Sequence, residues 1–189
     1  MLVIQFKPYG SFSFLKQSIH KLNNQVIPAE NIFGNDILKL REHILQANSP
    51  KTKFKTVTNW LNSIYNEKET PNPELLQIVD KLLSEPLTNH KKIISYYSKT
   101  QKHLISQFKK YCGLTPKVLH RIARFNELLL QINQQQQISW PQIAYQFGYT
   151  DQSHFIKELK EFSGFNPKEF ISKDLNNLEP NFFPLDPKG

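Results

Sequence analysis

The segment His103-Leu-Ile-Ser-Gln-Phe-Lys-Lys-Tyr-Cys-Gly-Leu-Thr-Pro116 returns fifty-one positions later as His154-Phe-Ile-Lys-Glu-Leu-Lys-Glu-Phe-Ser-Gly-Phe-Asn-Pro167. His, Ile, Lys, Gly and Pro recur identically, and Leu104/Phe155 and Phe108/Leu159 keep their apolar character. Each copy follows a shorter matched stretch, residues 93–98 for the first copy and residues 143–148 for the second. The repeat therefore predicts two copies of one small helical unit.

Each copy has the pattern of a helix-turn-helix, in which a tight turn lets the second helix project into a DNA major groove. In the second copy, Ala144 is small enough for close helix approach, and Gly148 permits the positive φ of the turn. The first copy has Ile94 and Ser98 at these two positions. We therefore expect both copies to fold alike, with the second closer to the pattern.

Polar side chains on the outer face of the second helix are candidate base readers, since amide, hydroxyl and ammonium groups can bond base edges. The candidates are Gln101, Lys102 and Ser106 in the first copy, and Gln152, Ser153, His154 and Lys157 in the second. Ile156 is a candidate contact for a thymine methyl. Simple solvation of a polar helix face is the alternative. His103 and His154 occupy equivalent positions, which favours a packing or backbone-contact role at least as strongly as base reading.

Residues 116–132 show the apolar spacing of a long helix that joins the two copies. At roughly 1.5 Å per residue it spans about 26 Å, which brings two successive major grooves within reach of the reading helices. Helix N-termini near residues 89 and 139 are further candidates for phosphate contact. Ser139 and Gln142 also have the spacing of a capping box. The candidate phosphate contacts are Lys91, Lys92, Lys110, Arg121, Arg124 and Ser139. For the two arginines, covering an apolar surface is an equally weighted alternative.

The chain of 189 residues has a net charge of +8, which favours polyanionic partners, although a solvated surface has the same signature. The charge is uneven: residues 74–172 carry thirteen Lys/Arg against eight Asp/Glu, and residues 173–189 carry two against three. A single cysteine, Cys112, excludes a disulfide framework and fits a reducing, cytoplasmic interior. We expect no metal site and no cofactor, since the six His form no metal-binding motif. No apolar run reaches the roughly 18 residues of a membrane span, and the start lacks the pattern of a signal peptide.

The predicted fold is mainly α, with two helix-turn-helix subdomains joined by a long linker helix and preceded by a small partial α+β segment. Residues 1–6 alternate weakly and predict a short strand, for which no partner strand is evident. Helices are expected at residues 29–47, 50–66, 74–84, 89–97, 100–111, 116–132, 139–148 and 151–163. The expected domains are 1–67 (partial sensor or interaction domain), 68–73 (linker), 74–172 (DNA-binding domain) and 173–189 (disordered tail).

Four segments of the repeat region resemble the AraC/XylS transcriptional regulators. They are Gly113-Leu-Thr-Pro116, Arg121-Ile-Ala-Arg-Phe125 and Ile143-Ala-Tyr-Gln-Phe-Gly-Tyr-Thr-Asp-Gln-Ser-His-Phe155, followed by Gly164-Phe-Asn-Pro167. The resemblance covers about 74–172. It implies sequence-specific binding to double-stranded promoter DNA, and activation through contact with RNA polymerase. Ser98 at the first turn and Lys157-Glu-Leu159 in the second copy depart from the family pattern.

A fainter resemblance covers residues 1–66. Phe6-Lys-Pro-Tyr-Gly10, Phe12–Phe14 and Val26-Ile-Pro28 with Ile32-Phe-Gly34 look like the end of a sensor domain that precedes some AraC-type modules. In those relatives a β-rich part comes before this point, so we expect the effector pocket to be missing or incomplete in this chain.

The leading hypothesis is a DNA-binding transcription regulator of the activator type that reads two successive major grooves. The alternative is an interaction protein that forms a homodimer or binds a partner through its N-terminal segment, with the DNA module as an anchor. We expect no enzyme activity: alkyl-transfer repair domains occur beside such modules, but their chemistry needs a cluster of activated cysteines, which Cys112 alone does not supply.

Overall fold

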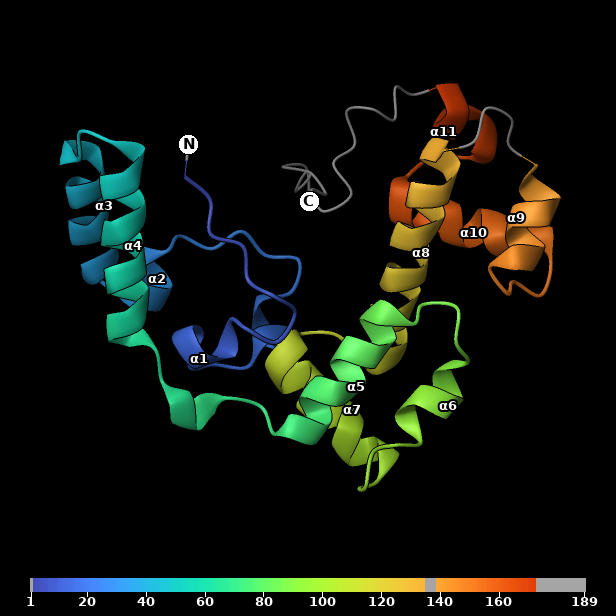
Figure 1. Ribbon diagram of the computed structural model, residues 1–189, viewed down its shortest axis with the longest axis horizontal. Coiled ribbons are helices and arrows are strands. Elements are labelled where there is room, and N and C mark those ends of the chain that lie inside the picture. Colours follow the sequence, from blue (N-terminus) through green and yellow to red (C-terminus); the bar gives the residue numbers. More distant parts are fainter. Residues whose placement is uncertain (1, 135–138, 173–189) are drawn as a thin grey trace. The chain divides into compact units, whose positions relative to one another are not determined.

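The computed structural model describes residues 2–134 and 139–172, and the regular structure in this part of the chain is helical (Figure 1). The prediction of a mainly α fold is therefore confirmed. The predicted strand is wrong, because residues 2–6 form neither strand nor helix. An isolated strand would leave its backbone groups without partners. Phe6 packs its ring on Phe14 instead, with the two centroids 5.2 Å apart.

The helices fall into two compact units. Of the described residues, 2–80 and 94–116 form the N-terminal unit, and 81–93, 117–134 and 139–172 form the C-terminal unit. The predicted domain boundaries at 67 and 74 differ from this division and stay predictions. The helices assigned wholly or mainly to the N-terminal unit are α1 (Phe12–Leu15), η1 (Ile19–Leu22), α2 (Glu30–Phe33), α3 (Asp36–Gln46), α4 (Pro50–Ile64), η2 (Glu67–Glu69), α5 (Pro73–Ser84) and α7 (Gln101–Cys112). Those of the C-terminal unit are α6 (His90–Ile94), α8 (Pro116–Gln134), α9 (Trp140–Gln146), α10 (Gln152–Ser163) and α11 (Pro167–Ser172).

Helices α3 and α4 lie side by side in the N-terminal unit (Figure 1). The single helix predicted at 29–47 is two helices, because the chain turns at Gly34 with φ +64° between α2 and α3. Helix α4 begins as predicted: the Ser49 hydroxyl accepts a hydrogen bond from the Thr52 N–H at 3.2 Å, and Pro50 occupies the first turn.

The beginning of the chain packs against the C-terminal end of α7 in the same unit. Phe12 meets Tyr111 edge-on, with 4.7 Å between the ring centroids. His20 Nδ1 and Asn23 Nδ2 donate to the carbonyl oxygen of Gly113 at 3.0 and 2.9 Å. These contacts link residues about ninety positions apart, and they attach the N-terminal segment to the end of a helix-turn-helix.

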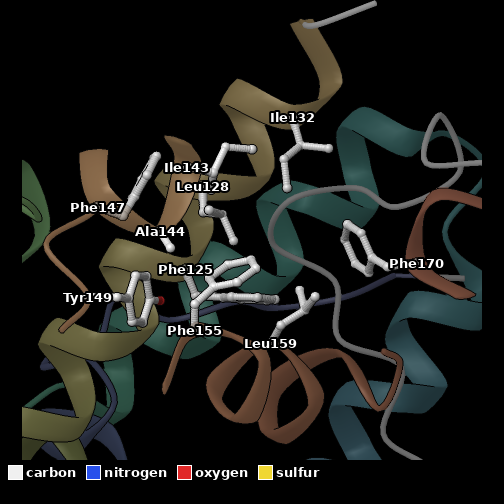
Figure 2. Packing of buried hydrophobic residues seen from close by; sticks show 10 residues of the cluster. All are labelled: Phe125, Leu128, Ile132, Ile143, Ala144, Phe147, Tyr149, Phe155, Leu159 and Phe170. Atoms are coloured by element: carbon white, nitrogen blue, oxygen red, sulfur yellow. The ribbon is translucent and has the colours of Figure 1, made fainter. Parts of the chain in front are cut away.

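One buried apolar cluster forms the core of the C-terminal unit (Figure 2). Helix α8 supplies one side, and the facing residues come from α9, α10, α11 and the turn before α10. The cluster consists of Phe125, Leu128, Ile132, Ile143, Ala144, Phe147, Tyr149, Phe155, Leu159 and Phe170. The long helix predicted at 116–132 is thus confirmed, and it carries the core of the second copy.

The sequence repeat is also a structural repeat. Helices α7 and α10 each run for twelve residues and end at a glycine in the left-handed region, Gly113 at φ +80° and Gly164 at φ +77°. Pro116 and Pro167 each begin the next helix. The predicted disordered tail at 173–189 lies outside the described residues.

Candidate nucleic-acid interface

The seven predicted base readers are exposed side chains on α7 and α10. On α7 they are Gln101, Lys102 and Ser106, and on α10 they are Gln152, Ser153, His154 and Lys157. The pairs 101/152, 102/153 and 106/157 stand at equal positions of the two helices. Lysine and serine exchange places between the copies: Lys102 precedes Ser106, whereas Ser153 precedes Lys157. Each helix thus presents a polar face whose side chains are exposed to solvent.

The opposite faces of both helices are buried, which fixes the direction of the polar faces. Leu104 and Phe108 of α7 are 1% and 0% exposed, and Phe155 and Leu159 of α10 are both 0% exposed. Full burial of side chains of this size contributes about 1.5–3 kcal/mol each. A rotation of either helix that hid its polar face would expose these apolar groups to water.

The turn of the second copy follows the prediction. Gly148 has φ +69°, and a Cβ built on it would meet nothing within 4 Å, so the backbone conformation alone requires glycine. The backbone N–H of Tyr149 donates to the carbonyl of Ala144 at 3.0 Å, which closes the turn onto α9. Asp151 then caps α10, accepting from the His154 N–H at 2.8 Å.

The turn of the first copy is held in another way. Ser98 is not among the described residues with positive φ. Its backbone N–H and its hydroxyl both donate to the carboxylate of Glu74 on α5, the hydroxyl at 2.9 Å. Thr100 caps α7 by accepting from the His103 N–H at 3.2 Å. Sequence reasoning missed Glu74, because nothing near residue 74 in the chain points to a turn twenty-four residues later.

The two equivalent histidines each contact a tyrosine of the preceding turn. His103 Nδ1 and the Tyr97 hydroxyl share a hydrogen bond of 2.8 Å, and their rings stack. His154 meets Tyr149 edge-on at 5.4 Å while remaining exposed. Burial, followed by the charge of Glu74, raises the pKa of Tyr97 above its ordinary value. These contacts support the packing role for His103, whereas His154 is open to both roles.

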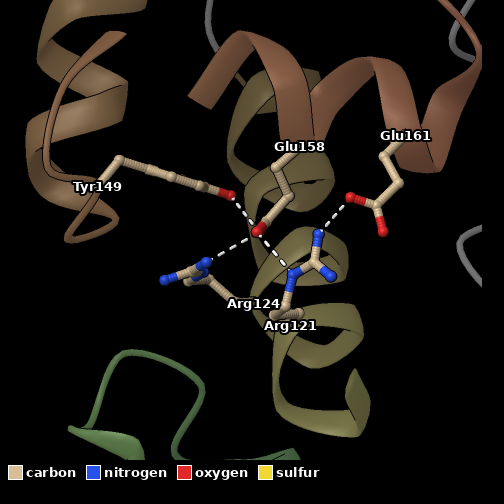
Figure 3. A network of polar contacts seen from close by, with 5 residues as sticks. All are labelled: Arg121, Arg124, Tyr149, Glu158 and Glu161. Atoms are coloured by element: carbon tan, nitrogen blue, oxygen red, sulfur yellow. Dashed lines mark hydrogen bonds and ion pairs between the residues drawn. The ribbon is translucent and has the colours of Figure 1, made fainter. Parts of the chain in front are cut away.

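The two arginines predicted to hold phosphates are bound to carboxylates of α10 (Figure 3). Arg121 Nε lies 2.8 Å from one oxygen of Glu158, and Arg124 lies 2.8 Å from the other. Arg121 also pairs with Glu161. Each guanidinium covers a ring as well, Arg121 that of Phe162 at 4.9 Å and Arg124 that of Tyr149 at 4.3 Å. A DNA phosphate would have to compete with these partners, so the covering role has structural support and the phosphate role stays a prediction.

Glu158 is 2% exposed, and its charge is stabilised from three sides. The Tyr149 hydroxyl donates to the same oxygen that Arg124 binds, at 2.7 Å. Burial on its own would raise the pKa of Glu158, but the hydrogen bonds from Arg121, Arg124 and Tyr149 outweigh it and lower the pKa. Burial, and then the Glu158 bond, raises the pKa of Tyr149. Glu158 is therefore a structural anion that joins α10 to α8.

The remaining phosphate candidates differ in their surroundings. Lys91 and Lys92 are exposed on α6. The Lys110 ammonium lies 4.8 Å from the ring centroids of both Phe12 and Tyr111, so it stabilises the attachment of the N-terminal segment.

Ser139 precedes α9, but its side chain makes no capping hydrogen bond, so the predicted capping box is wrong. Pro141 at the second helical position lacks one of the two N–H groups that such a cap can use.

Three other findings bear on the class of protein. Burial raises the pKa of the Cys112 thiol to about 12, which is the opposite of an activated nucleophile. Within residues 2–134 and 139–172, no group of three or more His, Cys, Asp or Glu side chains is placed to hold a metal ion. In the same part of the chain, no helix has the length and apolar character needed to cross a bilayer.

A family model described as a helix-turn-helix domain, of the AraC type, matches residues 95–173. Comparison with curated proteins and with solved structures gives no match. This match supports a DNA-binding domain of the AraC type at residues 95–173, and with it a role of the chain in transcription regulation. The matched region contains α7 and α10 with all seven predicted base readers. The resemblance of residues 1–66 to a sensor domain stays a prediction.

Proposed function

We propose that this regulator recognises a specific promoter sequence by inserting α7 and α10 into two successive major grooves, and that it activates transcription there. The observation that supports the proposal is the matched polar face of the two helices. Equal positions carry exposed hydrogen-bonding side chains, while the opposite faces are buried through Leu104 and Phe108 of α7 and through Phe155 and Leu159 of α10. A helix that is buried on one side and polar on the other is what major-groove docking requires.

Base reading is assigned to Gln152, Ser153 and Lys157 in one groove and to Lys102 and Ser106 in the other. Glutamine can make a bidentate bond to adenine, lysine can bond guanine, and serine suits either donor or acceptor edges. Ile156 is half-buried beside them and offers an apolar contact for a thymine methyl. We expect the second copy to contribute more of the specificity, because its turn has the standard glycine geometry.

Phosphate contact is assigned first to Lys91 and Lys92, which are exposed at the beginning of α6. Such contacts fix the register of a protein on DNA without reading its sequence. They also make the affinity depend on salt, in proportion to the number of phosphates neutralised.

Selection of bound duplexes from a random DNA pool, followed by salt titration of the selected site, tests this proposal. Two conserved elements one helical turn apart are expected if both copies read bases. One element alone would contradict the two-groove part of the proposal. A pool that shows no enrichment would contradict sequence-specific recognition as a whole.

The second candidate function is self-association or partner binding through the N-terminal unit. It rests on the large apolar side chains that this unit exposes, among them Val26 at 79%, Leu45 at 68% and Phe54 at 63%. Contact with RNA polymerase would likewise need an exposed protein surface. Light scattering over a range of concentrations tests self-association: a constant monomer mass would exclude the homodimer.

A further inference from the structure

A pocket of about 320 Å³ in the C-terminal unit is lined by α6, α8 and α10. One part of its lining is the network of Arg121, Arg124 and Glu158 drawn in Figure 3. His90 from α6, His120 and Lys117 from α8, and His154 from α10 complete the lining. The base-reading and packing roles described above use only His154, Glu158 and the two arginines.

The charge of the lining is predominantly positive. Lys117, Arg121 and Arg124 are cationic, and Glu158 is the only carboxylate among the described residues that line the pocket. That carboxylate is already bound by both guanidiniums and by the Tyr149 hydroxyl. Glu161 does not line the pocket, but it forms a second ion pair with Arg121. Lys117 is exposed and has no carboxylate partner among the ion pairs of the described residues.

Two buried nitrogen atoms belong to side chains of the same lining. His90 Nδ1 and Arg124 Nε are inaccessible to solvent, and neither has a hydrogen-bond partner within the described part of the chain. Buried polar atoms are normally paired, and leaving one unpaired costs about 1–3 kcal/mol. Arginine Nε is always a donor, and His Nδ1 is a donor in one tautomer and in the protonated ring. Unused donors beside fixed positive charge call for an anionic acceptor.

We propose that this pocket binds a phosphate group. A phosphate offers several acceptor oxygens and one or two negative charges, which matches the excess of cations and donors. Its source is either a free phosphate ester or a backbone phosphate of DNA. The inference stands apart from promoter recognition, because inorganic phosphate can be tested on the full chain without DNA.

The histidines make this binding dependent on pH. Burial, then the nearby charges of His120 and Lys117, lower the pKa of His90. Burial lowers the pKa of His120 against the opposing effect of its bond to the Glu85 carbonyl, and Arg124 lowers it further. Both rings are therefore neutral near pH 7, where they stack on each other with centroids 5.5 Å apart. Bound phosphate raises both pKa values, so binding takes up protons and tightens as the pH falls toward 6.

The test is a titration of the full chain with inorganic phosphate, followed by NMR of the histidine side chains. Chloride at matched ionic strength is the reference. We expect saturable shifts of the His90 and His120 signals, a rise of their pKa values, and tighter binding at pH 6 than at pH 7.5. Shifts that do not saturate, or that chloride reproduces, would overturn the proposal.

Lys117→Gln and Lys160→Gln form a matched pair for the same titration. Both lysines are exposed in the C-terminal unit, but only Lys117 lines the pocket. Lys117→Gln is expected to weaken phosphate binding about two- to fivefold, as for a partly exposed ion pair, and Lys160→Gln to leave it unchanged. Equal weakening by both variants would show nonspecific attraction and would contradict a phosphate pocket.

Duplex DNA distinguishes the two sources of phosphate. If the pocket takes a DNA phosphate, random-sequence duplex displaces inorganic phosphate, and Lys117→Gln lowers the salt dependence of DNA binding by about one phosphate. If it takes a free ester, phosphate and DNA bind together. Both results support the pocket. A chain that binds phosphate but no DNA would contradict the proposed function and leave this inference intact.

Discussion

The two copies of the repeat form the same pair of turn and reading helix by different physical means. The second copy uses the conformational freedom of Gly148 in its turn and a buried carboxylate, Glu158, on its reading helix. The first copy has Ser98 in the turn, bound to Glu74 from α5, and Gln107 at the position equivalent to Glu158. A turn can thus lose its glycine if a side chain from elsewhere binds its polar groups. The buried apolar faces maintain the same helix arrangement in both copies, whereas the turns can differ in sequence.

The largest effect is expected from Glu158→Ala. Removal of this carboxylate leaves Arg121 and Arg124 without their shared partner and breaks the bond from Tyr149. Breaking a buried ion pair from one side costs about 3–5 kcal/mol. The arginine side chains are 24% and 20% exposed, so we expect a loss of about 2–4 kcal/mol in the free energy of unfolding, measured by urea denaturation.

Gln107→Ala is the matched control in the first copy, with an expected loss below about 1 kcal/mol. Acid adds a second readout, because the pKa of Glu158 is lowered in the folded state. The contribution of ionised Glu158 to the free energy of unfolding is complete above the pKa of the unfolded state, about 4.3. It disappears as the pH falls through the lower pKa of the folded state. Equal losses for both variants, or an unchanged acid profile in Glu158→Ala, would show that Glu158 is not the link between α10 and α8.

The next comparison uses the two glycines that end the reading helices. A Cβ on Gly113 would lie 3.0 Å from Ile19 Cγ2 and 3.1 Å from Asn23 Oδ1, whereas a Cβ on Gly164 would meet nothing within 4 Å. Both have positive φ, so alanine costs about 1–2 kcal/mol at either position. We expect Gly164→Ala to lose that amount in thermal or urea unfolding, and Gly113→Ala to lose about 2–3 kcal/mol, since crowding adds to strain. If the two losses were equal, Ile19 and Asn23 would accommodate the added methyl group without cost, and crowding at Gly113 would be excluded.

Much of this molecule could be predicted from local patterns in its sequence. The repeat located both reading helices, the glycine turn and the exposed polar faces, because helix periodicity and left-handed glycines depend on neighbouring residues. The bonds from Glu74 to Ser98 and from Glu158 to Arg121 and Arg124 could not be predicted, because they join residues 24 to 37 positions apart.

The wrong predictions have physical causes of the same kind. Weak alternation in residues 1–6 indicated a strand, but alternation does not supply a neighbouring strand to pair with. Phe6 packs its ring on Phe14 instead. The capping box at Ser139 failed because the Ser139 side chain makes no hydrogen bond to the first turn of α9, although Gln142 stands at the required spacing. In both cases the pattern was present, but the hydrogen bonds that would make it effective did not form.

The third comparison concerns DNA rather than stability. Lys157 of α10 and Lys102 of α7 are exposed readers, one in each copy. We expect Lys157→Ala to cost about 1–3 kcal/mol on the selected DNA site and little on random duplex, with relaxed preference at one position. Lys102→Ala should have the smaller effect on specificity. Lys91→Ala, at a proposed phosphate contact, should weaken both DNAs alike and reduce the salt slope, as measured by fluorescence anisotropy. If all three variants lost the same affinity on the selected site as on random duplex, Lys157 would not be a base reader.

The smallest effect is expected at the first turn, from Glu74→Ala. The variant leaves the Ser98 N–H and hydroxyl to water, and because Ser98 is exposed the loss is about 0.5–1 kcal/mol. Gly148→Ala in the second copy should cost more, since its φ of +69° strains any side chain. Amide hydrogen exchange can locate both effects: Glu74→Ala should speed exchange at the beginning of α7, and Gly148→Ala at the beginning of α10. If Glu74→Ala left exchange in α7 unchanged, the serine turn would be stable by itself, and the two copies would differ in sequence without differing in how their turns are held.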